Sequence, residues 1–298
     1  MVFGVLEVGS TNTKAFIYKD GELHDYGIKY IPFKDNYKKD GRVSEIDLDK
    51  LKNLILDLKL EVDEIYAYGT SIFRNINNDE RTNIIKMFQD EMNVSFRVVS
   101  ADEENKYTVE GVIANIDYKG RMAVIIGGGG SSEVAIIDEG RVVDTLNLSF
   151  GAMDITNEFP ELKEDVVTTS FDKIFAYTNG LIPKFQDNVE VTVLAGGDYI
   201  YFYEKVGFPM NENIIYSDVN QPYMLDIETS EKYDYATLNI SLDKIKAENP
   251  ELAGWWDGAR GMRFCINVLA KRLNTKYIVP TRINMLLGLM TEIVKKKH

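Results

Sequence analysis

One pattern of apolar and polar residues occurs twice along the chain. Residues 2–18, VFGVLEVGSTNTKAFIY, predict a strand, a turn rich in glycine and hydroxyl residues, and a second strand. Residues 122–137, MAVIIGGGGSSEVAII, predict the same hairpin. The offset is 119 residues from Gly9 to Gly128, and the glycine that closes each hairpin, at Gly21 and Gly140, keeps the same offset. Two hairpins in one register predict two lobes of related architecture.

Helices and strands alternate after the first hairpin. Ser44 followed by Asp47 is typical of a helix start, and apolar residues at helical spacing follow it. Short apolar segments at 64–68 and 95–99 predict two strands, and the second leads into a helix that runs through Ile113. This alternation indicates an α/β lobe.

The second half repeats the pattern less regularly. Strands are expected at 191–194 and 277–279, and a Met-rich helix over about 284–294. Residues 200–260 are rich in Asn, Asp and Tyr, and no pattern there predicts an element.

The polar stretch Asp117–Gly120 is the expected boundary between the lobes. It divides the chain into an N-terminal lobe, residues 1–119, and a C-terminal lobe, residues 120–298. The last helix is expected to pack back on the first lobe. The length of 298 residues and an apolar content of 45% suit two globular lobes.

Composition narrows the class of protein. No apolar run approaches the ~20 residues of a membrane-spanning helix. Glu7 interrupts the first apolar run, so the N-terminus is interpreted as a strand rather than a signal peptide, and a cytoplasmic location is expected. The net charge of −13 argues against a sequence-blind nucleic-acid binder.

The scarce residues limit the chemistry. Cys265 is the single cysteine, which excludes an intrachain disulfide and a thiolate zinc site. The two histidines are His24 and the terminal His298, so histidine-based catalysis is not expected. In an enzyme of this composition the general base would be a carboxylate, and a metal would be a hard, oxygen-bound ion such as Mg²⁺.

Both hairpin turns have a composition that suits phosphate. Gly, Ser and Thr let an anion approach backbone N–H groups and hydroxyls closely. Neither turn matches the GxxxxGK[ST] loop or the GxGxxG spacing of a dinucleotide fold. Each turn alone could be an ordinary hairpin, but the matched pair favours phosphate binding.

Several segments, in their order, resemble one protein family. The segments EVGSTNT, YGTSIFR, VVSADEEN, IGGGGSSEV, LSFGAMDIT and LAGGDY are similar to those of the exopolyphosphatase and guanosine pentaphosphate phosphatase (Ppx/GppA) family, within the actin, sugar-kinase and heat-shock ATPase superfamily. The resemblance runs from residue 3 to about 200. It implies two actin-like (ribonuclease H-like) α/β lobes, each a mixed sheet with flanking helices, an active cleft between them, and the short form without an additional helical domain.

The resemblance also implies roles for individual residues. Arg74 corresponds to a phosphate clamp and Glu104 to the general base, whereas Glu7 and Glu133 would hold the metal, Mg²⁺ or Mn²⁺. The implied phosphate-binding residues are Gly9, Ser10, Thr11, Asn12, Gly128, Gly129, Gly130, Ser131 and Ser132.

Each role has a structural alternative. Arg74 could form a surface salt bridge, Glu104 could be a solvated glutamate of a first helical turn, and Glu133 could face solvent. Lys14, at the position equivalent to Glu133, could neutralise phosphate or be exposed.

Two departures from the family pattern bear on activity. Glu7 replaces an aspartate, and Ile126 replaces a second aspartate and cannot bind a metal. The implied function is Mg²⁺-assisted release of terminal phosphate from inorganic polyphosphate or guanosine pentaphosphate. One alternative is a non-catalytic binder of polyphosphate or an alarmone, which Ile126 favours, and another is an ATP-using relative of the sugar kinases. A symmetric dimer is expected from base rates.

Overall fold

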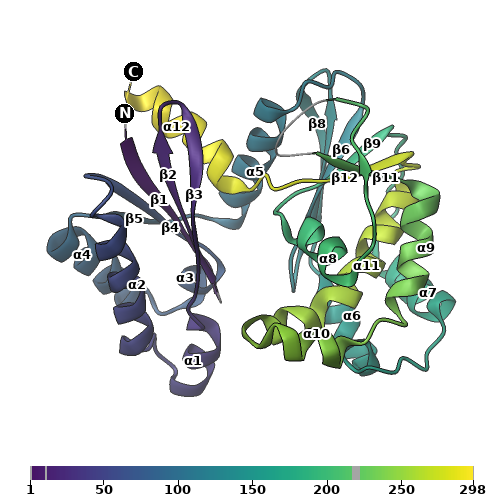
Figure 1. Cartoon of the computed structure of the whole chain (residues 1–298), viewed down its shortest axis with the longest axis horizontal. Helices are drawn as coiled ribbons and strands as arrows, with labels where there is room; N and C mark the ends of the chain where they lie inside the picture. The colour runs from purple at the N-terminus through teal and green to yellow at the C-terminus, as the bar shows by residue number, and fades with distance from the viewer. Residues whose placement is uncertain (1, 11, 217–221, 298) are drawn as a thin grey trace. The chain divides into compact units, whose positions relative to one another are not determined.

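The chain divides into two compact units, Met1–Lys106 and Tyr107–His298. The computed structural model describes residues 2–10, 12–216 and 222–297 (Figure 1). The division falls inside helix α5 (Ala101–Asn115), earlier than the expected boundary near residue 119. The reason lies in the second half of α5, where Gly111 packs against the backbone of Gly288 in the C-terminal helix. That helix groups with the second unit.

The first unit contains a mixed five-stranded sheet in the order β3-β2-β1-β4-β5. Strand β1 is antiparallel to β2 and parallel to β4, which is in turn parallel to β5. The elements of this unit before α5 are β1 (Val2–Val8), β2 (Asn12–Lys19), β3 (Glu22–Tyr30), α1 (Phe33–Asp40), α2 (Glu45–Leu58), β4 (Ile65–Gly69), α3 (Ser71–Asn75), α4 (Asn78–Met92) and β5 (Ser95–Val98).

The core of the first unit lies between this sheet and its helices. The expected helix after Ser44 is α2, and its buried Leu51 and Ile55 face the sheet at helical spacing. They share one apolar cluster with Leu6 and Val8 of β1. The end of β1, where the first glycine turn begins, is therefore anchored in a packed core.

The second unit contains a mixed seven-stranded sheet in the order β10-β11-β12-β9-β6-β7-β8. The predicted strands at 191–194 and 277–279 are β9 and β12, and the Met-rich helix is α12. The remaining elements are β6 (Met122–Gly127), β7 (Ser132–Asp138), β8 (Arg141–Leu148), α6 (Ala152–Glu158), η1 (Pro160–Lys163), α7 (Phe171–Leu181), β9 (Val191–Leu194), α8 (Asp198–Val206), β10 (Asn211–Glu212), β11 (Tyr223–Asp226), α9 (Ile227–Thr237), α10 (Leu242–Glu248), η2 (Pro250–Leu252), α11 (Ala253–Arg272), β12 (Tyr277–Pro280) and α12 (Met285–Lys297).

Both faces of the seven-stranded sheet are buried. Along β6, Ala123 and Ile125 belong to the cluster that contains residues of α11. Met122 and Val124 point the other way and belong to the cluster that contains residues of α5. This explains why 122–126 is continuously apolar rather than alternating. The two mixed sheets with flanking helices confirm the α/β fold predicted for the chain.

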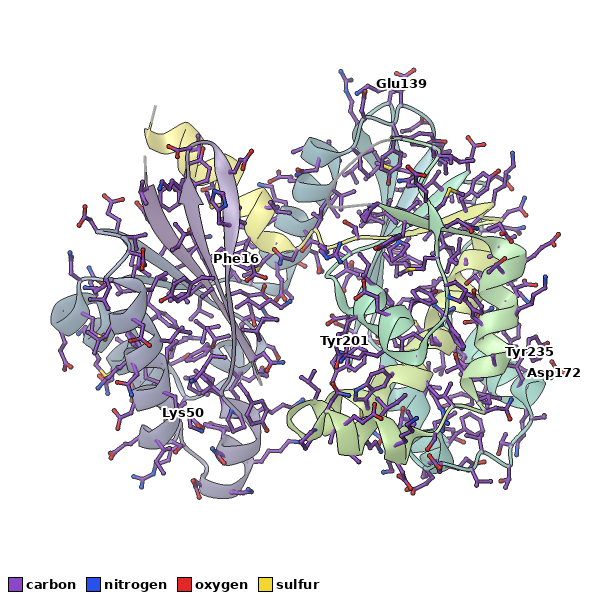
Figure 2. All side chains as sticks on the ribbon, in the orientation of Figure 1. Phe16, Lys50, Glu139, Asp172, Tyr201 and Tyr235 are labelled. Atoms are coloured by element: carbon purple, nitrogen blue, oxygen red, sulfur yellow. The ribbon has the colours of Figure 1, made fainter. Side chains whose placement is uncertain are left out.

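The predicted repeat of two hairpins is confirmed. Strands β1 and β2 pair as an antiparallel hairpin, and so do β6 and β7. At the far end of each hairpin two residues have positive φ: Asp20 and Gly21 at 55° and 94°, and Glu139 and Gly140 at 48° and 74°. Glu139 stands at an exposed tip (Figure 2). A third antiparallel strand, β3 or β8, then follows each hairpin.

Residues 200–260, for which the sequence predicted no element, form most of the helical layer that includes α8–α10 and the start of α11.

Arg260 of α11 is fully buried, and burial lowers its pKa to about 10. Its guanidinium joins two chain segments to α11 by donating to five backbone carbonyls, those of Leu162, Glu164, Thr237, Leu238 and Ile240. Residues 217–221 of this stretch lie outside the described residues. Among the described residues, no helix combines the length and the apolar character needed to cross a membrane.

Candidate functional site

The first glycine turn joins β1 to β2 and is held by backbone hydrogen bonds. The N–H of Gly9 donates to the carbonyl of Asn12 at 2.9 Å. The carbonyl of Ser10 accepts from the N–H of Lys34, in the first turn of α1, at 2.9 Å. Thr11, a predicted phosphate-binding residue, lies outside the described residues. The three described residues therefore lie together in one turn that is braced by a helix start.

The second glycine turn, between β6 and β7, is braced in the same way. The N–H of Gly128 donates to the carbonyl of Ser131 at 2.8 Å. The carbonyls of Gly128 and Gly129 accept from the N–H groups of Ala152 and Met153, at 3.0 and 2.8 Å. These donors form the first turn of α6, so the helix start holds two successive peptide groups of the turn.

This bracing orients the amide hydrogens of the turn. In a trans peptide the C=O and the N–H point in opposite directions. Because the carbonyls of Gly128 and Gly129 face α6, the N–H groups of Gly129 and Gly130 point away from it. Neither N–H donates to a backbone carbonyl in the described part of the chain. Two adjacent amides on one side of a glycine turn form a concave site that suits a phosphate oxygen.

The two turns share a second equivalent contact. The bond from Lys34 to Ser10 and the bond from Met153 to Gly129 join positions that are related by the offset of 119 residues. The bonds within the turns, from Gly9 to Asn12 and from Gly128 to Ser131, follow the same offset. The repeat therefore extends beyond the hairpins to the helix start behind each turn.

The charged residues of the two hairpins differ at equivalent positions. Glu7 stands opposite Lys14 in the first hairpin, whereas Ile126 stands opposite Glu133 in the second. Glu7, Ile126 and Glu133 are all half-buried. In the described residues, no three His, Cys, Asp or Glu side chains are grouped so that they could hold a metal ion. Each hairpin thus offers one carboxylate near its turn.

Ser132 ends the second turn on its buried side. Its hydroxyl lies 3.4 Å from the sulfur of Cys265 in α11. Burial raises the pKa of the Cys265 thiol to about 11, so the single cysteine stays protonated at neutral pH. The side chain of Ser132 therefore points into the core, and the residue can offer a phosphate only its backbone.

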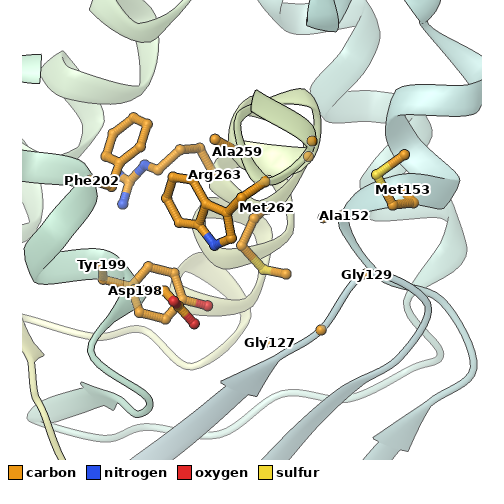
Figure 3. A pocket seen from close by; sticks show the side chains of 14 residues that line it. Gly127, Gly129, Ala152, Met153, Asp198, Tyr199, Phe202, Ala259, Met262 and Arg263 are labelled. Atoms are coloured by element: carbon orange, nitrogen blue, oxygen red, sulfur yellow. The ribbon is translucent and has the colours of Figure 1, made fainter. Parts of the chain in front are cut away.

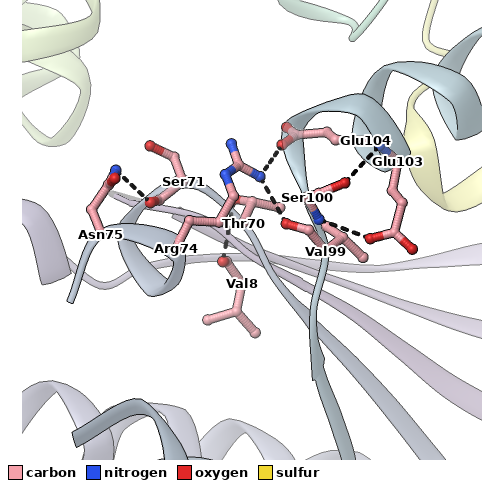
Figure 4. Close-up of polar contacts among 9 residues, drawn as sticks. All are labelled: Val8, Thr70, Ser71, Arg74, Asn75, Val99, Ser100, Glu103 and Glu104. Carbon is pink, nitrogen blue, oxygen red and sulfur yellow. Dashed lines mark hydrogen bonds and ion pairs between the residues drawn. The ribbon is translucent and has the colours of Figure 1, made fainter. Parts of the chain in front are cut away.

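Arg74 and Glu104, the predicted clamp and base, are in direct contact in the first unit (Figure 4). Arg74 lies near the end of α3, which begins where β4 ends, and Glu104 lies in the first turn of α5, which follows β5. The Nη1 of Arg74 donates to the Oε2 of Glu104 at 2.7 Å and to the carbonyl of Val99 at 3.1 Å.

Both side chains of this pair remain accessible. The Arg74 side chain is 25% exposed and the Glu104 side chain 30% exposed. Both side-chain hydrogen bonds that Arg74 donates within the described residues use Nη1. Its Nε and Nη2 therefore keep their hydrogens for a ligand, and a planar guanidinium can donate two parallel bonds to one phosphate.

The start of α5 is fixed by a reciprocal cap. The N–H of Glu103 donates to the hydroxyl of Ser100 at 3.1 Å, and the N–H of Ser100 donates to the carboxylate of Glu103 at 2.9 Å. This is a capping box, and it sets the direction in which the first turn of α5 presents its side chains. Glu104 is thus carried by a well-defined helix end.

A pocket of about 300 Å³ lies next to the second glycine turn, within the second unit (Figure 3). Its lining is mostly apolar and aromatic, as is typical of sites for small organic groups. Met153, Tyr199 and Met262 line it, together with Gly127–Gly129 and Trp255. The second glycine turn and the pocket therefore share Gly128 and Gly129.

Tyr199 gives this pocket a polar group. Its hydroxyl is buried and has no hydrogen-bond partner within the described chain, and burial raises its pKa well above the usual value. Asp198, which begins α8, also lines the pocket. No local pattern predicts this pocket, because Trp255 and Tyr199 reach it from helices α11 and α8, which are distant in sequence. The Trp255-Trp256 pair was the available signal.

Solved structures match this fold over nearly the whole chain. A Ppx/GppA family member from Aquifex aeolicus superposes with a TM-score of 0.78 at 16% identity and covers 100% of this chain and 99% of its own. An exopolyphosphatase from Cytophaga hutchinsonii superposes with a TM-score of 0.75 at 14% identity, with coverage of 99% and 98%. At these identities the likeness shows the fold.

A curated relative matches part of the chain. The bifunctional 3-dehydroquinate synthase/phosphatase of Fusobacterium nucleatum subsp. nucleatum is 27% identical over 150 residues, which is 49% of this chain. The match spans 22% of that relative's length, so this chain corresponds to about a fifth of it. The relative therefore shares one region with this protein.

The family follows from a match along the sequence itself. The model of the Ppx/GppA phosphatase family matches residues 36–201, more than half of the chain. This range contains Arg74, Glu104 and the second glycine turn. The chain belongs to the Ppx/GppA phosphatase family.

Proposed function

We propose that the protein is a phosphohydrolase that releases terminal phosphate from inorganic polyphosphate or guanosine pentaphosphate. A water molecule attacks the terminal phosphorus, and Glu104 accepts the proton that the water loses. The bond between that phosphorus and the bridging oxygen breaks, and the bridging oxygen leaves with the shortened chain. Arg74 stabilises the charge on the transferring group.

The contact between Arg74 and Glu104 carries this proposal. A clamp and a base must act on the same phosphoryl group, and these two side chains lie 2.7 Å apart on two helix ends. Glu104 is held in place by Arg74, and the capping box orients its helix. The unused Nε and Nη2 of Arg74 supply donors for the phosphate. A composition with two histidines, one of them terminal, also leaves the base role to a carboxylate.

The second glycine turn supports a phosphate substrate independently. The amides of Gly129 and Gly130 point away from α6, and no side chain of these residues limits the approach of an anion. The first turn has an equivalent brace, through Lys34 and Ser10. We assign phosphate binding to both turns.

The donors present suit a Mg²⁺ or Mn²⁺ ion that arrives with the substrate. Mg²⁺ usually binds through one or two carboxylates together with substrate phosphates and water. Glu7 and Glu133 are carboxylates of this kind, each two residues or fewer from a glycine turn. When bound, the metal would neutralise charge on the phosphate oxygens.

The direct test is phosphate release from polyphosphate by purified Glu104→Gln protein. We expect kcat to fall by about 10²- to 10⁴-fold, the usual contribution of a general base. Glu91→Gln is the matched control, because Glu91 is an exposed glutamate on α4 and its substitution removes the same charge. If Glu104→Gln released phosphate as fast as the control, the role assigned to Glu104 would be wrong.

The apolar pocket favours guanosine pentaphosphate as the substrate. An inorganic chain has no apolar part to fill a space lined by Met262, Trp255 and Tyr199, whereas a nucleoside does. We expect Met262→Ala to lower kcat/KM for guanosine pentaphosphate by about tenfold and to leave that for inorganic tripolyphosphate within twofold, since the lost contact is apolar. Equal effects on both substrates would remove this preference.

Protection against thermal unfolding by ATP, with none from polyphosphate, would favour the sugar-kinase-like alternative.

The non-catalytic alternative rests on Ile126. Ile126 stands opposite Glu133, where a second carboxylate would complete a pair of metal ligands. A binder would hold polyphosphate tightly and show no turnover with Mg²⁺ or Mn²⁺. Turnover by the wild-type protein excludes this alternative.

A further inference from the structure

Three arginines from three elements of the first unit line one open hollow of about 540 Å³. Arg74 comes from α3, Arg81 from α4 and Arg97 from β5. Four residues of its lining are apolar, namely Ile85, Phe96, Val98 and Val99. The hollow shares Arg74 with the candidate active site, but Arg81 and Arg97 have no role in the proposed reaction.

The charges around this hollow are not balanced. Arg97 forms an ion pair with Glu103, which also lines the hollow and caps α5. Arg74 forms its ion pair with Glu104. Arg81 donates to the side-chain oxygen of Asn78 at 2.5 Å and to the backbone carbonyl of Arg74 at 3.4 Å, both neutral. Within the described residues Arg81 has no carboxylate partner.

The position of Arg81 makes this imbalance more costly. Arg81 is half-buried and lies in the first turn of α4, where the helix dipole disfavours a positive charge. Glu80 of the same turn is engaged elsewhere, since its carboxylate accepts the N–H of Val43 at 2.6 Å. An anion in the hollow would give Arg81 a charged partner.

We propose that this hollow is a second anion subsite, which holds a phosphate group joined through an anhydride bridge to the phosphate at Arg74. The choice of a phosphate chain as occupant rests on the proposed function. The fork of Arg81 matches a phosphate group in shape, and Arg97 can turn from Glu103 toward the same anion. The apolar part of the lining strengthens charge interactions, because it excludes water from one side. The subsite selects substrates with more than one phosphate.

The test is binding of inorganic tripolyphosphate, measured by calorimetry without divalent cations so that the chain is not hydrolysed. We expect Arg81→Ala to raise Kd by about five- to tenfold, in line with the loss of a charge-assisted hydrogen bond to phosphate. The double variant Arg81→Ala/Arg97→Ala should raise Kd further. Arg81→Lys keeps the positive charge but loses the planar guanidinium, so its Kd should lie between those of the wild type and Arg81→Ala. Lys86→Ala is the matched control, because it removes a positive charge from an exposed site on the same helix that does not line the hollow.

Orthophosphate separates a chain phosphate from a released product. If the hollow holds an inner phosphate of a chain, Arg81→Ala weakens tripolyphosphate and leaves orthophosphate within twofold. An equal loss for orthophosphate would overturn the assignment to a chain. Tripolyphosphate binding by Arg81→Ala at the level of Lys86→Ala would overturn the subsite itself.

These outcomes do not depend on turnover. A protein that binds tripolyphosphate through Arg81 but releases no phosphate would refute the proposed hydrolysis and keep the subsite. A protein whose turnover requires Glu104, but whose affinity for tripolyphosphate is unchanged in Arg81→Ala, would support the proposed hydrolysis and refute the subsite.

Discussion

The two hairpins share a backbone and differ in their surroundings. Each has a glycine turn braced by a helix start at the same offset of 119 residues. The first lies in the unit that carries the polar pair of Arg74 and Glu104, whereas the second adjoins an apolar pocket lined by Met262. The same braced turn therefore stands in two chemical settings, and under the function proposed above the first unit would serve the chemistry and the second the recognition of the substrate.

The hairpins also differ in how they place charge. The first pairs Glu7 with Lys14 across its strands, and the second pairs Ile126 with Glu133. Opposite charges directly across an antiparallel pair stabilise each other. The residue opposite Glu133 is apolar, so the two hairpins place their carboxylates in different cross-strand surroundings.

The brace behind the second turn offers the strongest way to break the comparison. A Cβ at Gly151 would lie 2.2 Å from the carbonyl oxygen of Gly128, so Gly151→Ala must push the turn away from α6. We expect tripolyphosphate affinity to fall at least tenfold and the free energy of unfolding to fall by about 2 kcal/mol, as for other overpacked sites. Calorimetry and urea unfolding measure the two effects.

Gly180→Ala is the control for this change. A Cβ there meets no atom within 4 Å, and alanine favours helix, so the variant should bind normally and be slightly more stable. Normal binding by Gly151→Ala would show that the turn does not depend on its brace.

A substitution at Ile126 tests the difference in charge. Ile126 is half-buried, so Ile126→Asp can place a carboxylate opposite Glu133 without burying it fully. We expect the Mg²⁺ concentration for half-maximal phosphate release to fall by about tenfold, because a second hard oxygen ligand is added. Ile126→Asn keeps the size without the charge. An unchanged Mg²⁺ requirement in the aspartate variant would mean that this position does not face the metal.

The buried hydroxyls of the two hairpins provide a smaller test. Thr13 is fully buried, and its hydroxyl has no hydrogen-bond partner among the described residues; the equivalent Ser132 contacts Cys265. Thr13→Val should raise the free energy of unfolding by about 1 kcal/mol, because it removes an unsatisfied polar atom without changing shape. Ser132→Ala should lower it slightly. Urea unfolding that gave the opposite order would point to a partner for Thr13 in the folded protein.

The hairpin tips offer the smallest effect. Glu139 has φ of 48°, a conformation that asparagine adopts more readily than glutamate. Glu139→Asn should raise stability by about 0.5 kcal/mol, the scale of such backbone effects. Asp20→Asn should change it less, since aspartate already tolerates this conformation. Thermal unfolding of the two variants tests the order.

Local patterns were enough to predict much of the fold. Both hairpins, the helix after Ser44 and the strand at 191–194 follow from short-range periodicity, and each is present. Helix α11 was not predicted, because it is buried on nearly all sides and yet contains charged residues. Arg260 is accommodated there by carbonyls from two distant segments, 162–164 and 237–240, and no local pattern encodes such partners.

The candidate site was predictable only in part, for the same reason. Family resemblance pointed to Arg74 and Glu104, and their contact spans 30 residues of sequence. The pocket beside the second turn and the hollow at Arg81 each combine side chains from several elements. Their chemistry becomes visible only when the elements are packed together.

The brace of α6 on the second turn has one more consequence. An anion site formed by the backbone N–H groups of Gly129 and Gly130 contains no group that gains or loses a proton in water. An anion held there would respond to acidity only through its own ionisation, with a second step near pH ~6 for a phosphate monoester. Under the proposed function, the contribution of these two amides to binding would therefore not change with the protonation of the turn itself.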